Sequence, residues 1–65
     1  MNMEDTIILS AVADLKVFGY PEVNQTNILE DNVYRKFFQY QLDSLANDPT
    51  PSIKQAVKSI REKMA

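Results

Sequence analysis

The clearest hydrophobic pattern in this chain of 65 residues lies at its C-terminal end. Apolar residues recur there at intervals of three and four, the spacing that places side chains on one face of an α-helix. They are Ile53, Ala56, Val57, Ile60 and Met64. Thr50 is a suitable N-cap, and Pro51 suits the first helical position because its missing N–H would be unpaired there in any case. The pattern predicts an amphipathic helix over about residues 51–64.

The middle of the chain, about residues 28–46, carries two hydrophobic stripes at helical spacing. One stripe consists of Val33, Phe37 and Tyr40, and the other of Tyr34, Phe38, Leu42 and Leu45. Together they cover about 200° of the helix, whereas an ordinary surface helix has an apolar stripe of about 100° or somewhat more. Asn27 and Glu30 resemble a capping box at its start. A helix of this kind needs neighbours on two sides.

The N-terminal segment fits a third helix over about residues 4–18, with Gly19 just past its end. Its main apolar face is Ile8, Ala11, Val12, Leu15 and Phe18, and a second stripe is Leu9, Ala13 and Val17. The β-branched run at residues 6–8 is also compatible with the start of a strand. The residues after it do not continue a strand pattern, so we expect a helix.

Two polar segments that contain proline, residues 19–27 and 47–51, separate the three helices. We therefore expect one all-α domain over residues 1–65, a small three-helix bundle in which the last helix packs on the Phe38 and Leu42 face. So small a domain buries only about 60% of the surface that its unfolded chain exposes. Two helices with apolar residues on two sides therefore predict a helical homodimer, or a larger protein as an obligate partner.

The aromatic residues indicate where such a partner would bind. Four of the six lie within the seven residues from Tyr34 to Tyr40. Aromatic side chains are enriched at protein interfaces because they offer a large area and lose few rotamers. The predicted interface consists of Val33, Phe37 and Tyr40 together with Leu9 and Val17. The alternative is that this stripe lies in the core of the bundle.

The amino-acid composition excludes most kinds of catalytic and metal-binding site. The chain has no cysteine and no histidine, so thiolate and imidazole ligands are absent and no serine has a histidine as its base. Ser59 and Lys63 share a helix face, but on the polar side, where lysine keeps its proton. Gly19 is the only glycine, which excludes a glycine-rich phosphate loop. We expect no enzyme activity, no cofactor and no bound metal.

The charge is unevenly distributed along the chain. The net charge is −2, but residues 1–31 sum to −5 and residues 32–65 to +3. Lys54, Lys58 and Arg61 line one side of the last helix, and residues 45–57 have the outline of a helix-turn-helix. Three phosphate contacts would give only weak, salt-sensitive binding, and few residues suited to reading bases accompany them. Weak nucleic-acid binding by this stripe is the alternative function.

The leading expectation is a non-enzymatic protein-interaction module that docks an apolar, aromatic helical face on itself or on a host protein. Small helical chains without cysteine, histidine or tryptophan are common among bacterial and phage accessory proteins, so a regulatory role of that kind fits the format. No apolar run approaches the length of about 20 residues that spans a membrane. Acidic residues precede the short apolar run near the start, unlike in a signal peptide. We expect a cytoplasmic protein.

Overall fold

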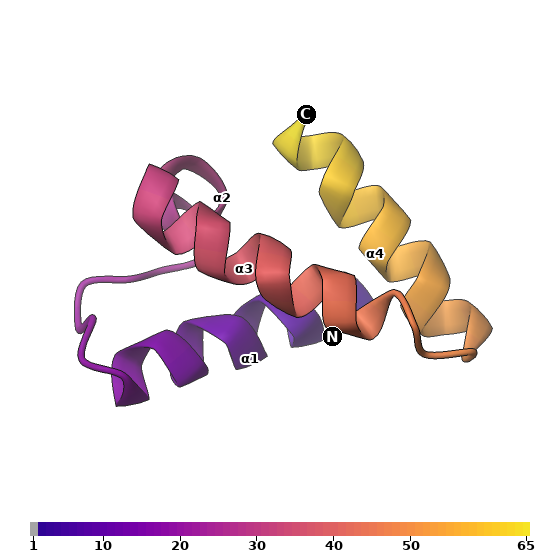
Figure 1. The fold of residues 1–65 in the computed structure, drawn as a ribbon, viewed down its shortest axis with the longest axis horizontal. Helices are drawn as coiled ribbons and strands as arrows, with labels where there is room; N and C mark the ends of the chain where they lie inside the picture. Colours follow the sequence, from indigo (N-terminus) through magenta and orange to yellow (C-terminus); the bar gives the residue numbers. More distant parts are fainter. Residues whose placement is uncertain (1) are drawn as a thin grey trace.

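A computed structural model describes residues 2–65, which form four helices and no strand. The helices are α1 (Met3–Val17), α2 (Asn27–Glu30), α3 (Asn32–Leu45) and α4 (Pro51–Met64). In Figure 1, α1 and α3 run in opposite directions, and α4 lies at the side of the molecule where α1 begins and α3 ends. α4 packs on both α1 and α3, and α2 packs mainly on α3. The expectation of a small all-α bundle is confirmed.

The middle segment differs from the sequence-based expectation. The hydrophobic pattern predicts one helix over about residues 28–46, but the structure breaks it at Asp31, whose backbone is extended. The carboxylate of Asp31 accepts hydrogen bonds from the backbone N–H groups of Val33 at 2.9 Å and of Tyr34 at 3.3 Å. A short acceptor side chain of this kind competes with helix continuation and caps a new helix instead. The result is the single turn of α2, followed by α3 in a new direction.

The capping box expected at Asn27 and Glu30 is also wrong. A reciprocal pair of this type forms three residues earlier, between Asn24 and Asn27. Oδ1 of Asn24 accepts from the backbone N–H of Asn27 at 2.9 Å, and Oδ1 of Asn27 accepts from the backbone N–H of Asn24 at 2.8 Å. The motif therefore closes the loop that leads into α2 and leaves Glu30 outside it.

The other helix ends follow the sequence signals closely. Gly19 lies just past the end of α1 with a φ of 109°, a conformation that residues with a Cβ rarely adopt. Its N–H donates to the carbonyl of Lys16, and the N–H of Tyr20 donates to that of Leu15, which together form a Schellman motif. Thr50 precedes α4 as expected, but its hydroxyl makes no capping bond, and Pro51 is the first helical residue.

The core is one cluster that draws on all four helices and on the loop after α1. Its buried members are Ile7, Ile8, Ala11, Val12, Leu15, Val23, Ile28, Phe38, Leu42, Ala56, Val57, Ile60 and Met64. The expected packing of the last helix on the Phe38 and Leu42 face is confirmed, although Leu45 and Ile53 are only partly buried. Val23, in the segment expected to be a polar loop, is 2% exposed. That segment thus contributes to the core as well as connecting two helices.

Candidate protein-interaction surface

Several large apolar side chains lie outside the core. Val17 is 87% exposed, Tyr40 80%, Phe18 69% and Val33 61%. Phe37 is partly buried against the core. We call these five residues, Val17, Phe18, Val33, Phe37 and Tyr40, the aromatic surface. Four of them belong to the interface expected from the sequence, which the structure therefore leaves open to solvent or half covered.

Phe18 and Leu9 lie in different surroundings from those that the sequence pattern suggests. Phe18 is expected in the core, but it is the C-cap of α1, and its ring points outward beside α3. Leu9 is expected at the interface, but it is half-buried. It lies eight residues before Val17, which at about 100° per residue places it about 80° further around α1 from that side chain. Leu9 thus lies apart from the aromatic surface.

Two aromatic pairs join the end of α1 to α3. The rings of Phe18 and Phe37 meet edge to face, with centroids 5.5 Å apart and an interplanar angle of 63°. The rings of Tyr20 and Tyr34 meet in the same way at 5.8 Å and 78°. Edge-to-face contacts match the positive ring edge with the negative ring face. They hold the loop at Gly19 against α3 and fix the position of Phe18.

The relative position of α1 and α3 follows from two contacts. Phe18 meets Phe37, and one α1 turn earlier Nε2 of Gln41 donates to Oδ2 of Asp14 at 3.0 Å. The helices are therefore antiparallel, and position 17 of α1 lies level with position 38 of α3. Val17 lies about 60° around α1 from Asp14, beyond the side that contacts α3, and it is 87% exposed on the outside of this helix pair. The aromatic surface consequently extends across both helices.

The edge of α3 beside this surface is polar and charged. Tyr40, Asp43, Ser44 and Asn47 line an open hollow of about 410 Å³. Oδ1 of Asp43 is 2.7 Å from Nη2 of Arg61 on α4, although the Asp43 side chain is still 74% exposed. Lys36, two helical turns before Asp43, forms no ion pair with residues 2–65. The surface therefore combines an apolar centre with one cation and one anion at the same edge.

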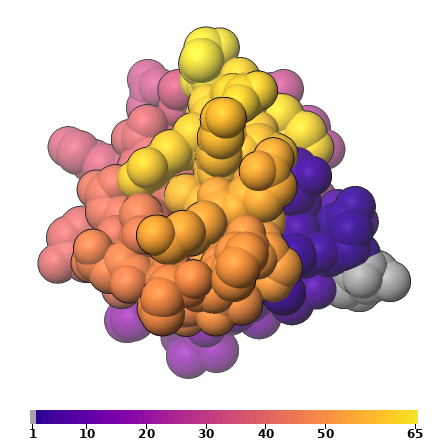
Figure 2. All heavy atoms as spheres, turned by 90° about the vertical axis from the view of Figure 1, so that its right-hand side faces the viewer, coloured from indigo at the N-terminus to yellow at the C-terminus, as the bar shows by residue number. Residues whose placement is uncertain are grey.

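The basic stripe of α4 lies elsewhere on the molecule. Figure 2 shows that the C-terminal segment covers much of the side on which this helix lies. Lys54, Lys58 and Arg61 border a hollow of about 500 Å³ that includes the apolar side chain of Val57. Arg61 also forms the ion pair with Asp43, so part of the positive charge of the stripe is offset within the chain.

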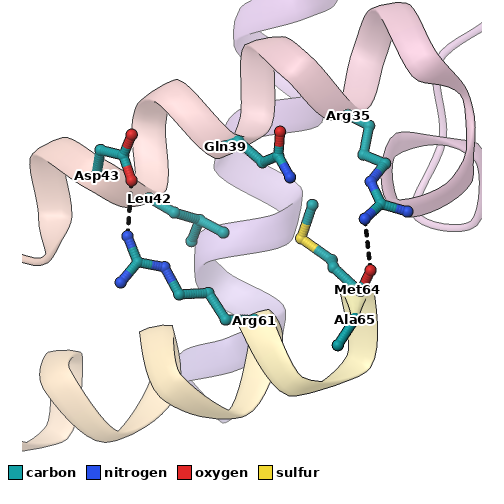
Figure 3. A pocket seen from close by; sticks show the side chains of 7 residues that line it. All are labelled: Arg35, Gln39, Leu42, Asp43, Arg61, Met64 and Ala65. Carbon is teal, nitrogen blue, oxygen red and sulfur yellow. Dashed lines mark hydrogen bonds and ion pairs between the residues drawn. The ribbon is translucent and has the colours of Figure 1, made fainter.

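A third hollow, of about 510 Å³, lies between α3 and α4 and is drawn in Figure 3. Arg61 crosses it from α4 to Asp43, and Arg35 crosses it from α3 to the backbone carbonyl of Met64. Both arginine side chains are thus engaged in holding the two helices together. Their contacts give this hollow a structural role.

An ion pair between Lys63 and Glu4 links α4 to α1. Nζ of Lys63 lies 2.9 Å from Oε1 of Glu4. The hydrogen bond and the charge of Glu4 raise the pKa of Lys63, which is the opposite of what a lysine base requires.

Within residues 2–65 no three acidic, histidine or cysteine side chains gather in a way that could hold a metal ion. None of the described helices combines the length and the apolarity needed to cross a bilayer.

Comparison with protein-family models, with curated proteins and with solved structures finds no significant match.

Proposed function

We propose that this chain is a non-enzymatic interaction protein that binds another protein surface through the aromatic surface. The observation that carries the proposal is the exposure of Val17, Phe18 and Tyr40, which are 69–87% exposed on one side of the α1 and α3 pair. Contiguous exposed apolar surface marks sites of protein association. Aromatic residues at the centre of such a site contribute much of the binding free energy.

Core residues hold part of the aromatic surface in a fixed position, which favours binding. Phe37 is half-buried in the core cluster and holds Phe18 by the edge-to-face contact. A surface that is already ordered loses little conformational entropy when a partner binds. A chain of this size would act on its partner by covering part of it, as an accessory or regulatory component of the cytoplasm.

The test is site-specific cross-linking in the cells of origin. A photo-reactive residue replaces Tyr40 in one variant and Lys58, on the basic stripe, in a matched control. Position 40 is expected to cross-link to protein and position 58 to give far less product. Cross-links to protein or nucleic acid from position 58, with none from position 40, would overturn the proposal and favour the basic stripe as the binding site.

A further inference from the structure

We infer that the protein that covers the aromatic surface is a second copy of this chain, packed through an antiparallel pairing of the two α3 helices. The inference rests on the proposed function, because it names the partner for the same residues. The two-fold axis crosses α1 and α3, so that each helix lies against its own counterpart and runs in the opposite direction. Such an interface uses the same patch on both copies and must therefore be self-complementary.

The shape of α3 meets this requirement. The hollow beside Tyr40 is lined by residues at positions i, i+3, i+4 and i+7, which end at Asn47. A hole with this spacing receives a side chain from a facing helix. At the other end of the same face, Val33 is 61% exposed and projects as such a side chain. An antiparallel pairing inserts Val33 of each copy into the hollow of the other copy.

The charges fit the same arrangement. With Val33 in the hollow, Lys36 of one copy lies opposite position 40 or 41 of the other, about one helical turn from Asp43. Both residues occupy the same edge of α3, and equivalent edges face each other in an antiparallel helix pair. Lys36 has no ion-pair partner within residues 2–65, and Asp43 is 74% exposed despite its contact with Arg61. Two symmetric pairs between Lys36 and Asp43 therefore become possible.

This alignment of the two α3 helices also gives a contact to Val17, the most exposed apolar side chain of α1. Inserting Val33 into the hollow places the two-fold axis level with position 38 of α3. Position 17 of α1 lies at this level, as the contacts of Phe18 and Asp14 establish. Val17, which is 87% exposed, then faces Val17 of the second copy across the axis. One arrangement thus covers Val17, Val33 and Tyr40 together.

The size of the molecule is sufficient for such an interface. A stable dimer covers about 800 Å² on each partner. The chain exposes 4440 Å² in all, and its Cα atoms extend over 32 × 22 × 21 Å. An interface of that size would take about a fifth of the surface that each copy exposes.

Cysteine cross-linking tests the register directly, because the chain contains no cysteine of its own. Under mild oxidation, Val17→Cys is expected to form a disulfide dimer. Val33→Cys alone is expected to form little, because the two copies of Val33 lie about 16 Å apart along the helix axis. A mixture of Val33→Cys and Ser44→Cys is expected to give the mixed dimer. Lys58→Cys, on the basic stripe, is the control for random collision.

The charge pairs are tested by mixing two variants. Lys36→Glu and Asp43→Lys each create two repulsive pairs in their own dimer, and each should weaken self-association about tenfold at low salt. In the mixed dimer both pairs are attractive again, so mixing should restore association. Efficient self-cross-linking of Val33→Cys, or a mixture of the charge variants no tighter than either alone, would overturn the antiparallel arrangement.

Light scattering separates failure of this inference from failure of the proposed function. The expected mass is twice 7.5 kDa at high concentration. A mass of 7.5 kDa at every concentration, with position 40 cross-linking to a different protein in cells, would overturn the inference and leave the proposed function standing. A chain that neither self-associates nor cross-links through position 40 would overturn both.

Discussion

Phe18, the residue that ends α1, packs the edge of its ring against Phe37 in the middle of α3, with ring centroids 5.5 Å apart. One of these residues is mostly exposed and the other is half-buried, so their contact joins the aromatic surface to the core. An aromatic pair of this geometry contributes about 0.5–1.5 kcal/mol beyond the area that it buries.

A double-mutant cycle on this pair should therefore show coupling. Phe18→Ala and Phe37→Ala each lower the free energy of unfolding, and the double variant should lose about 1 kcal/mol less than the sum. Urea unfolding, at concentrations where the chain is monomeric, measures all four proteins. Phe18→Ala combined with Lys58→Ala serves as the control and should be additive, because these residues lie on different parts of the molecule. Additivity of the Phe18 and Phe37 variants would mean that the rings do not interact.

Ile60 on α4 is fully buried, and replacing it should strongly destabilise the fold. Ile60→Ala removes buried methyl groups and leaves a cavity, which costs about 2–5 kcal/mol. In a domain of this size the loss approaches the whole free energy of unfolding. Circular dichroism during heating measures the effect. Lys54→Ala on the exposed side of α4 should melt close to the parent, and equal melting of both variants would show that α4 does not pack as described.

Asp31 caps α3, and this cap should contribute measurably to the free energy of unfolding. Asp31→Ala leaves the N–H groups of Val33 and Tyr34 without their acceptor, and should lower the free energy of unfolding by about 1 kcal/mol. Asp31→Asn keeps a side-chain oxygen and should retain most of the stability. If alanine and asparagine destabilise the fold equally, the negative charge matters more than the hydrogen bonds.

Asp48 makes the loop before α4 sensitive to acid. Its hydrogen bonds with Thr50 lower the pKa of this carboxyl below its ordinary value of 3.8. A lowered folded-state pKa contributes stability that is complete above the ordinary value and is lost as the pH falls through the folded value. Asp48→Asn should thus lower the melting temperature at neutral pH, with the difference from the parent shrinking as the pH falls below 3.8. A difference that is the same at pH 7 and pH 2 would contradict this linkage.

Hydrophobic periodicity predicts the environment of a residue well where its helix has a single apolar face, and poorly where the helix has several. α4 has one apolar face and polar residues elsewhere, so its periodicity gives both its position and its buried side. The break at Asp31 was missed because local hydrogen bonds to Val33 and Tyr34 overrode a continuous helical pattern. Periodicity predicts a core position for Phe18 because it does not include the turn that Gly19 introduces immediately after it.

The aromatic surface, too, is only partly predictable from hydrophobic periodicity. Val33, Phe37 and Tyr40 were identified because their spacing forms a stripe separate from that of Phe38. Whether this stripe faces α1 or solvent depends on how α1 packs, which the sequence pattern does not determine. The contact between Asp14 and Gln41 decides it, because it places α1 beside Phe37 and leaves Tyr40 open.

The ion pair of Lys63 with Glu4 brings the last turn of α4 beside the first turn of α1. The first turn of α1 also lines a hollow with Ser52 and Ser59 of α4, so α4 covers this end of α1. α1 is 15 residues long, so this region is about 22 Å from Phe18 along the helix. A fluorophore, an affinity tag or a fused domain attached before α1 should leave the aromatic surface free.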